Sequence, residues 1–287
     1  MGSVYKKELR SYFCNMQGAI FSGFLLLIAG IMTVLYNLKG LYPNFEYVLS
    51  DTGFIFLLIV PIVTMRIFAE EKHAKTDQLL YSLPLKGTDI VLGKYFAAVT
   101  VFLVPVGVMS FYPLILSLYG KVNFAAAYGA LFGFILLGCA LLAIGMYISS
   151  LTESQVIAAV ISFGTLLLLY LMNALTSLIP STSGASFIAF SVVAVLAGLL
   201  VWAMTKDRYA GLFTALLAES VLVFLYFKFK DSFAGLFAKV MEKLSVFERF
   251  SGFVNGIFDL TAVVYYLSIV AFCVFLCVQS VEKKRWS

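Results

Sequence analysis

Two Gly-Lys pairs are the residues of this sequence that come nearest to a nucleotide-binding loop. A P-loop needs a Ser or Thr directly after its Lys and a further Gly at a fixed spacing upstream. Tyr95 follows Gly93-Lys94 and Val122 follows Gly120-Lys121, and neither pair has the upstream Gly. We therefore do not expect this chain to hydrolyse ATP by itself or to bind a cofactor of its own.

Metal and thiol chemistry are not expected either. His73 is the single histidine, and the chain has 4 cysteines. Cys273 and Cys277 are four residues apart and share one helix face, which favours ordinary helix packing over a metal site without further histidines. The sequence contains no zinc-protease motif and no nucleophile elbow. It therefore predicts a chain without catalytic or metal-binding residues, which is not an enzyme.

The composition is that of a membrane protein. Of the 287 residues, 62% are hydrophobic and only 12% are charged, and the mean hydropathy is +1.00. Soluble domains carry about twice that charged fraction, roughly 25%. Because long apolar segments cross a bilayer as helices, we predict an all-α polytopic membrane protein in contact with lipid, and no nucleic-acid partner.

Eight apolar runs predict eight transmembrane helices, since each is near the length of about 20 residues that a membrane-spanning helix needs. An even number places both termini on one side of the membrane. Most of the 20 Lys and Arg residues lie in inner segments if that side is the cytoplasm, as the positive-inside rule requires. The predicted spans are Gly18–Leu38, Gly53–Ile67, Ile90–Leu118, Ala125–Ser149, Ser154–Ser177, Ser186–Met204, Tyr209–Phe227 and Gly256–Ser280.

Two acidic residues lie within predicted spans. Glu219 is near the middle of the seventh and Asp259 is near the outer end of the eighth. An ionised carboxylate at the centre of a bilayer is costly, so Glu219 is a candidate for ion binding. One alternative is a neutral Glu219 bonded to a hydroxyl or amide of a neighbouring helix, and another is a shifted segment in which Glu219 faces a water-filled vestibule. Asp259 is expected at the membrane interface.

Small residues recur in the fourth predicted span. Gly129 and Gly133 form a small-xxx-small pair, and Gly138 and Gly145 follow in the same helix. Such residues allow two helix backbones to approach closely. The pattern is equally consistent with packing inside this chain and with contact between two copies of it.

The stretch from Met65 to Lys94 is the longest densely charged interruption in the sequence. Thr76 is a candidate N-cap, Asp77 follows in the first turn, and Pro84 ends the pattern. These residues predict a short amphipathic helix that is too brief to cross a bilayer. Its apolar face, which would bury against a partner protein, consists of Leu79, Leu80 and Leu83.

This stretch resembles the loop between the second and third membrane helices of bacterial type-2 ABC transporter permeases, closest to the gliding-motility-like branch. In that family the loop, residues 66–88 here, forms the coupling helix that docks on a cytoplasmic ATPase. The family usually has Gly where this chain has Lys75, at the point where a tight bend is expected. The residues that carry the resemblance are Met65, Arg66, Phe68, Glu70, Glu71, Lys72, Thr76, Leu79, Leu80, Pro84, Gly93 and Lys94. It implies an ATPase-coupling function for Glu70, Glu71, Thr76, Asp77, Leu79, Leu80, Leu83 and Pro84.

Both ends of the chain extend the resemblance. Residues 1–17 are amphipathic over Val4 to Met16, which predicts an interfacial elbow helix, the alternative being a leader without fixed structure. Residues 228–252 predict an amphipathic external helix before the last span. Since the family commonly has six spans, Ser186 to Phe227 is expected to be an inserted pair of helices. The matching C-terminal residues are Arg249, Phe250, Gly252, Asn255, Gly256, Asp259, Leu260, Val264 to Ser268 and Glu282 to Trp286.

The resemblance implies one permease domain over residues 1–287 of a bacterial plasma membrane protein, most simply an exporter subunit. Two copies of an ATPase, which bind ATP and Mg²⁺, a second or homologous permease copy and an auxiliary external protein are the expected partners. Two other functions stay open from the residues alone. One is an ion-gradient-driven carrier that uses Glu219, and the other is a membrane assembly factor without transport.

Overall fold

The structure is a computed structural model that describes residues 1–14, 16–76, 86–178, 180, 182–205, 208–228 and 233–286. The chain forms two compact units, one of Met1–Leu169 with Val246–Ser287 and one of Tyr170–Ser245. Every regular element in the described residues is helical. The all-α prediction is therefore confirmed. The single permease domain stays a prediction.

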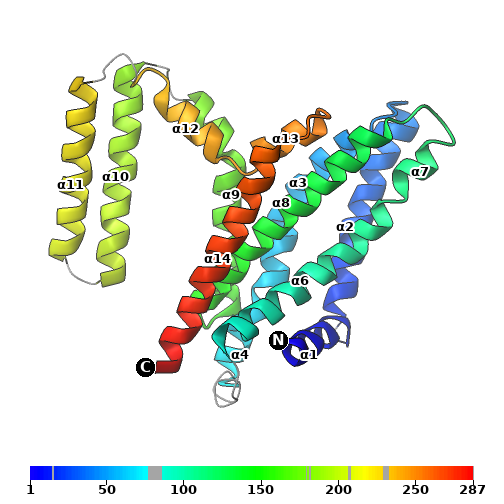
Figure 1. Ribbon diagram of the computed structural model, residues 1–287, viewed down its shortest axis with the longest axis horizontal. Coiled ribbons are helices and arrows are strands. Elements are labelled where there is room, and N and C mark those ends of the chain that lie inside the picture. Colours follow the sequence, from blue (N-terminus) through cyan, green and yellow to red (C-terminus); the bar gives the residue numbers. More distant parts are fainter. Residues whose placement is uncertain are drawn as a thin grey trace. The chain divides into compact units, whose positions relative to one another are not determined.

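The first unit contains most of the helices (Figure 1). Its N-terminus, its C-terminus and the end of α4 lie at the same end of the unit, while α13 lies at the other. The helices are α1 (Gly2–Cys14), α2 (Gln17–Thr33) with its π-helical continuation η1 (Val34–Lys39), α3 (Phe45–Thr64), α4 (Arg66–His73), α6 (Gly87–Met109), α7 (Tyr112–Leu116), α8 (Phe124–Leu151), the start of α9 (Gln155–Leu178), α13 (Glu248–Val254) and α14 (Leu260–Trp286).

The core of this unit is built around α8, which packs against α3, α4, α6, α13 and α14. Three glycines of α8 permit this packing. A Cβ atom at Gly133 would lie 2.7 Å from the Phe253 ring, one at Gly138 2.3 Å from the Phe102 ring, and one at Gly145 2.4 Å from the Thr64 hydroxyl. The small residues of the fourth predicted span thus serve packing inside the chain, although Gly129, with nothing within 4 Å, faces open space.

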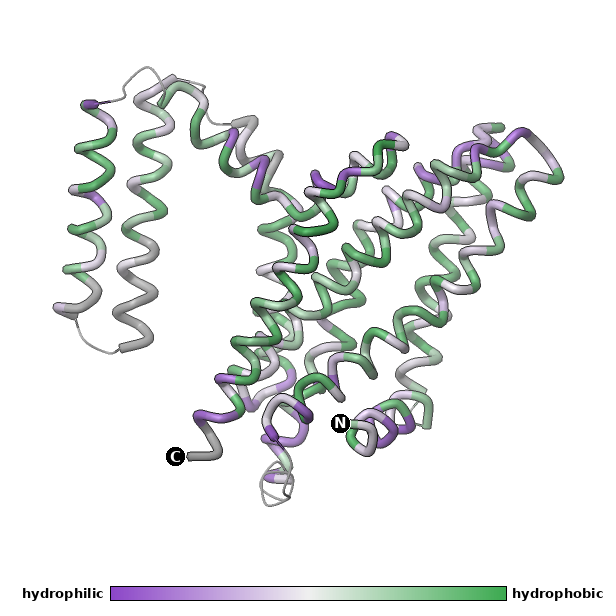
Figure 2. Tube along the Cα trace, viewed as in Figure 1, coloured by the Kyte–Doolittle hydropathy of each residue, from purple (hydrophilic) through white to green (hydrophobic). Residues whose placement is uncertain are grey.

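Six helical segments of the described residues are long and apolar enough to cross a membrane. Figure 2 shows their apolar middle portions and the polar residues that gather towards the ends. Helices α10 (Ser183–Thr205) and α11 (Arg208–Lys228) have 23 and 21 residues, which at about 1.5 Å per residue corresponds to roughly 30 Å or more. Eight spans therefore remain a prediction. The six segments are Gly18–Lys39, Phe45–His73, Gly87–Leu116, Phe124–Leu151, Gln155–Met172 and Leu260–Lys283.

The second unit is a pair of helices with a third against it. Helix α10 packs along α11, as the predicted inserted pair requires, and α12 (Leu236–Leu244) packs against α10. The ring of Phe190 on α10 meets Phe237 on α12 with centroids 5.1 Å apart. Between α10 and α11, the Ser191 hydroxyl donates a hydrogen bond of 3.1 Å to a carboxylate oxygen of Glu219.

The prediction of one amphipathic helix over residues 228–252 is wrong. Within its described part the chain forms α12 and α13, separated by Ser245, which has an extended backbone (φ −66°, ψ 118°). The apolar residues of the two halves belong to different cores, since Phe237 packs against α10 and Phe253 packs against α8. A straight helix would place both sets on one stripe.

Candidate functional site

The base of the loop between α4 and α6 begins with an interruption of the second membrane helix. Helix α3 ends at Thr64, Met65 forms a turn, and α4 starts at Arg66. Backbone groups near such an interruption need partners from elsewhere, because buried amide and carbonyl groups are rarely left unpaired. Three other helices supply side chains to this segment.

Ser149 of α8 forms three hydrogen bonds with the backbone around this interruption. Its hydroxyl oxygen accepts hydrogen bonds from the Phe68 and Ala69 amides at 3.2 and 3.3 Å, and it donates to the Met65 carbonyl at 3.1 Å. Gly145 lies four residues earlier on the same helix face, where α8 touches Thr64. Because Gly145 has no side chain, α8 can approach the end of α3 closely. This approach places the Ser149 hydroxyl within hydrogen-bond distance of the backbone between α3 and α4.

Helix α1 contributes Tyr12 to the same segment. The Tyr12 side chain is buried, and its hydroxyl donates to the Val63 carbonyl at 3.3 Å. The predicted N-terminal helix is therefore formed and is attached to the end of α3. Its interfacial position in the membrane stays a prediction.

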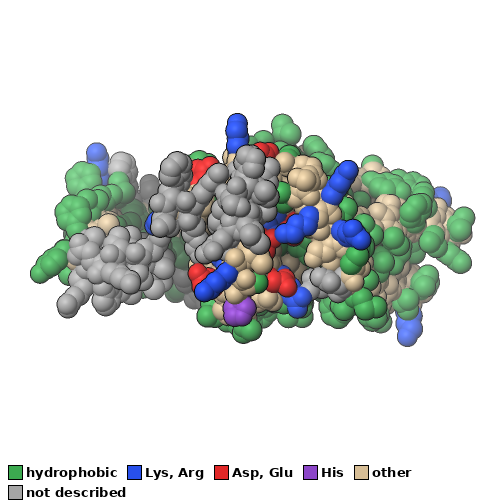
Figure 3. Space-filling model, turned by 90° about the horizontal axis from the view of Figure 1, so that it is seen from below, with side chains coloured by type: hydrophobic (Ala, Val, Ile, Leu, Met, Phe, Trp, Pro, Cys, Tyr) green, Lys and Arg blue, Asp and Glu red, His purple; other side chains and the backbone are tan. Residues whose placement is uncertain are grey.

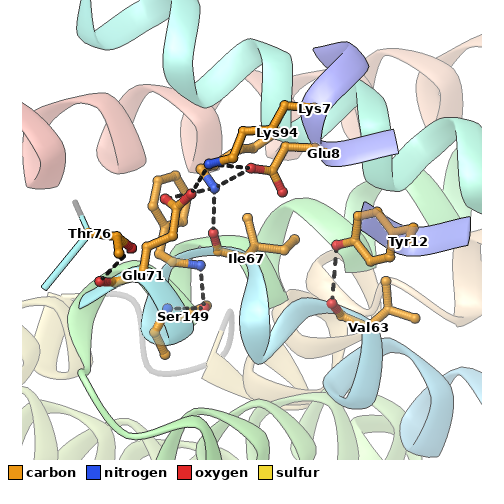
Figure 4. A network of polar contacts seen from close by, with 11 residues as sticks. Lys7, Glu8, Tyr12, Val63, Ile67, Glu71, Thr76, Lys94 and Ser149 are labelled. Atoms are coloured by element: carbon orange, nitrogen blue, oxygen red, sulfur yellow. Dashed lines mark hydrogen bonds and ion pairs between the residues drawn. The ribbon is translucent and has the colours of Figure 1, made fainter. Parts of the chain in front are cut away.

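Lys94 of α6 is the centre of the charged part of the site (Figure 4). Its side chain is only 1% exposed. The ammonium group donates to Glu8 of α1, to Glu71 of α4 and to the Ile67 carbonyl, each at 2.9 Å. An ammonium group has three donors, so these acceptors satisfy it fully. The ring of Phe68, 5.3 Å from the nitrogen to the ring centroid, covers it further.

Lys7 completes a cluster of two positive and two negative side chains. Its ammonium group lies 2.9 Å from Glu71 and 3.9 Å from Glu8. Partial burial disfavours the Lys7 charge, but the hydrogen bond to Glu71 and the negative charges of Glu71 and Glu8 outweigh this and raise the pKa of Lys7. Because the cluster is neutral overall, the charge of the buried Lys94 is compensated while the cluster holds α1, α4 and α6 together.

At the same end of the unit, further contacts join α14 to α8 and the N-terminal ammonium group to α6. Lys72 of α4 is buried and donates to the carbonyl of Ser150 on α8. The Ser280 hydroxyl of α14 donates to the same carbonyl at 3.2 Å. The N-terminal ammonium group lies 3.6 Å from Asp89. Figure 3 views this end of the molecule, where basic and acidic side chains gather. Five helices thus meet where the loop begins and ends.

Helix α4 ends in a tight bend at Lys75. The Thr76 amide donates to the Glu71 carbonyl at 2.9 Å, and the Lys75 amide donates to the Lys72 carbonyl at 3.1 Å. These two bonds form a Schellman motif, whose residue at the bend is left-handed and usually Gly. Lys75 has φ 54°. The bend expected from the family pattern is therefore present, with a Lys in the position that favours Gly.

Replacing Lys75 by Gly should stabilise the protein. A left-handed conformation costs an L-residue roughly 1–2 kcal/mol, and the extra chain entropy of Gly offsets roughly 0.5–1 kcal/mol of that. We expect Lys75→Gly to raise the free energy of unfolding in mixed micelles by about 0.5–1 kcal/mol. Lys75→Ala, which removes the charge but keeps Cβ, is the matched control. Equal stability of the Gly and Ala variants would contradict the strain assigned to this bend.

The predicted coupling residues fall into two groups. Glu71 lies in the charged cluster, Glu70 is exposed, and the Thr76 hydroxyl donates to the Glu71 carbonyl at 3.3 Å, which closes α4. The predicted N-cap function of Thr76 concerns residues that the structure does not describe, so it stays a prediction. The other predicted residues, Asp77, Leu79, Leu80, Leu83 and Pro84, also lie outside the described residues.

The two predicted intramembrane charges have hydrogen-bond partners of their own. Glu219 accepts a hydrogen bond from the Ser191 hydroxyl of the neighbouring helix, and ion binding by Glu219 stays a prediction. Asp259 precedes α14, and one of its carboxylate oxygens accepts the Thr261 amide at 2.8 Å. Hydrogen bonds from the Thr261 side chain and backbone lower the pKa of Asp259. Asp259 is thus a helix N-cap, with a local structural function.

Several residues of this site, among them Lys94, Glu8 and Ser149, were not predicted from the sequence as functional candidates. Lys94 was quoted only as part of the family pattern, although a Lys directly before a long apolar run is a recognisable signal because of its cost of burial. Glu8 lies in the predicted N-terminal helix, to which only an interfacial position was assigned. Ser149 carries no signal of its own, since Ser is common in membrane helices and its partners are backbone groups 80 residues or more away in sequence.

Comparison with known families agrees with this arrangement. A family model described as ABC-2 family transporter protein matches residues 5–279. The chain belongs to this family. No curated protein and no solved structure matches it. The match covers α1 and the base of the loop, and it runs through both compact units.

ABC-2 family membership makes this chain a multi-pass membrane permease of an ABC transporter. Such permeases are non-catalytic subunits that work with a cytoplasmic ABC ATPase and a second permease copy. An ion-gradient-driven carrier and an assembly factor are not favoured by the match. The gliding-motility-like branch stays a prediction.

Proposed function

We propose that this ABC-2 permease is an exporter subunit of a bacterial plasma membrane transporter, with both termini and the loop of residues 66–88 in the cytoplasm. Two permease copies form the pathway, and two ATPase subunits, which hold ATP and Mg²⁺, dock on the loop. The observation that carries the proposal is the Lys94 cluster, because it joins both ends of this loop to α1.

The cluster gives the loop a rigid base. Glu71 lies six residues before the first residue outside the described part of the loop, and Lys94 lies on the helix that follows it. A displacement of the loop would therefore move α3, α4 and α6 together, and α1 with them. A mechanism in which nucleotide-driven closure of the ATPase switches the membrane helices between two packed arrangements needs such a lever. Glu70, exposed beside Glu71, is positioned to meet the ATPase directly.

Substitution of the apolar face of the loop tests this function. A buried Asp in an apolar interface is unpaired and costs several kcal/mol. We therefore expect Leu79→Asp or Leu83→Asp to abolish co-purification of the ATPase and ATP-driven transport, while the permease still inserts into the membrane. The measurements are pull-down of the P-loop ATPase and transport in proteoliposomes.

A matched control is available at the other end of the first unit. Leu118 is 81% exposed in the segment between α7 and α8. Leu118→Asp introduces the same charge away from the proposed docking face, so it should leave ATPase binding unchanged. If Leu79→Asp and Leu83→Asp retained ATPase binding and transport, the coupling function of the loop would be wrong.

A further inference from the structure

A groove of about 460 Å³ lies on the surface between α2 and α3. Tyr12 of α1 and Arg66 of α4 line it together with residues of α2 and α3. Its volume is in the range of about 300–1,000 Å³ that is typical of small-molecule sites. The remaining lining residues are all apolar, namely Ile20, Phe21, Phe24, Leu58, Ile59, Ile62, Val63 and Met65.

The open side of the groove is apolar and faces away from the protein. Ile20 and Ile62 are 69% and 60% exposed, and Phe24 and Leu58 are also exposed. These residues belong to two of the candidate membrane spans. In a membrane permease, an exposed apolar surface within the spans meets lipid chains. The groove is therefore a place where a lipid chain can lie between two helices.

The groove has a length that suits a single leaflet. Leu58 and Arg66 are eight positions apart along α3 and α4, which corresponds to about 12 Å of helix rise. One leaflet contributes about half of the hydrocarbon thickness of about 30 Å. A groove of this length with an arginine at one end matches one acyl chain of a single leaflet and the phosphate of its headgroup.

Arg66 gives the groove one charged end. It lies at the start of α4, at the end of the unit that carries both termini. A guanidinium group has five donors in a fork that matches phosphate oxygens, so it can bind a phosphate in addition to contacts within the protein. On α1, the Lys6 and Arg10 side chains are exposed. Neither of them lines the groove, so Arg66 is the lining residue that makes this end basic, as an anionic headgroup requires.

We propose that this groove binds an anionic phospholipid, with the phosphate on Arg66 and one acyl chain between α2 and α3. The site requires only that the chain spans a membrane, and it is independent of the proposed ATPase coupling. The bound lipid would lie against Tyr12, whose hydroxyl is bonded to the Val63 carbonyl. It would thus complete the contact between α1 and the interrupted second membrane helix.

Native mass spectrometry of the full-length permease tests the site. The protein would be extracted mildly and titrated with phosphatidylglycerol or phosphatidylcholine, and the bound lipids counted. We expect tight binding of one phosphatidylglycerol, reduced about tenfold by Arg66→Ala, which equals about 1.4 kcal/mol. Ile62→Trp should displace the same lipid by filling the groove without changing any charge.

Two matched variants distinguish this site from general attraction to the membrane surface. Lys6→Ala removes an exposed charge of α1, and Leu27→Trp adds the same bulk at a residue of α2 that is 58% exposed and does not line the groove. Both should retain the lipid. Unchanged lipid binding in Arg66→Ala and Ile62→Trp, or an equal loss in the controls, would overturn the proposal. So would a disulfide cross-link between two copies of the Ile62→Cys variant, because a second copy would then cover the groove.

Discussion

Replacing Lys94 by Met is expected to destabilise the permease by about 3–5 kcal/mol, the usual cost of removing one partner from a buried ion pair. Met keeps the length of the side chain but leaves Glu8 and Glu71, which are only 14% and 16% exposed, without their shared cation. The Ile67 carbonyl also loses its donor. The measurement is equilibrium unfolding of purified protein in mixed micelles.

Lys7 offers a matched control in the same cluster. It contacts the same two carboxylates, but its side chain is 62% exposed. Water can replace much of its contribution, so Lys7→Met should cost about 0–1 kcal/mol. Lys94→Met leaves two carboxylates beside one Lys, so adding Glu71→Gln restores the charge balance of the cluster and should recover part of the lost stability. Equal effects of Lys94→Met and Lys7→Met would show that burial does not strengthen the Lys94 contacts.

Coupling should respond to the same substitution. If the cluster is the rigid base of the loop, Lys94→Met loosens α4 from α1 and α6 and reduces ATP-driven transport even where the ATPase still binds. This outcome differs from that of Leu79→Asp, which should remove ATPase binding itself. Measuring both transport and ATPase pull-down for the two variants distinguishes a loss of ATPase binding from a loss of coupling between the bound ATPase and the membrane helices.

Replacing Gly138 by Ala is the second substitution with a large expected effect. The added Cβ would lie 2.3 and 2.5 Å from two carbon atoms of the Phe102 ring. Phe102 is itself 1% exposed and packs against Phe56 and Phe134, with centroids 5.6 and 6.2 Å apart. The ring therefore has little room to move. We expect a loss of about 1–3 kcal/mol of unfolding free energy, as is typical of overpacked cores.

Gly129 is the matched control on the same helix. A Cβ there would have nothing within 4 Å. Gly129→Ala should therefore be neutral or stabilising by up to about 1 kcal/mol, through the better helix propensity of Ala. The two variants differ only in what the new methyl group meets. A Gly138→Ala protein as stable as Gly129→Ala would contradict the close packing of α6 on α8.

The hydropathy of the sequence predicted where most helices lie, because long apolar runs leave few alternatives. It failed at the start of the second span. Gly53 was predicted as the first residue of that span, whereas α3 begins at Phe45. Glu46 and Asp51 lie in the part of α3 before Gly53, where Glu46 is 2% exposed and Asp51 accepts the Tyr36 hydroxyl at 2.5 Å. Acidic residues lower the hydropathy of the segment that contains them, so a count of apolar residues starts the span after Asp51.

The charged cluster could be predicted only in part. Glu71 was identified because it belongs to the family pattern of the loop. The partners of Glu71 come from α1 and α6, 64 residues away in the case of Lys7. Charge signs alone do not specify which of many Lys and Glu residues meet. Ser149 illustrates the same difficulty, since its hydrogen bonds depend on how closely α8 approaches α3 at Gly145.

The division of the chain into two units has an evolutionary consequence. Among the described residues, the hydrophobic core around α8 takes its buried side chains from the first unit, ending at Leu166 and resuming at Val246. The pair α10–α11 has its own interface, including Ser191 and Glu219. A lineage of permeases could therefore gain, lose or exchange these helices as one cassette without repacking the core. Natural variation in this family would then concentrate in a module that leaves the charged base of the loop intact.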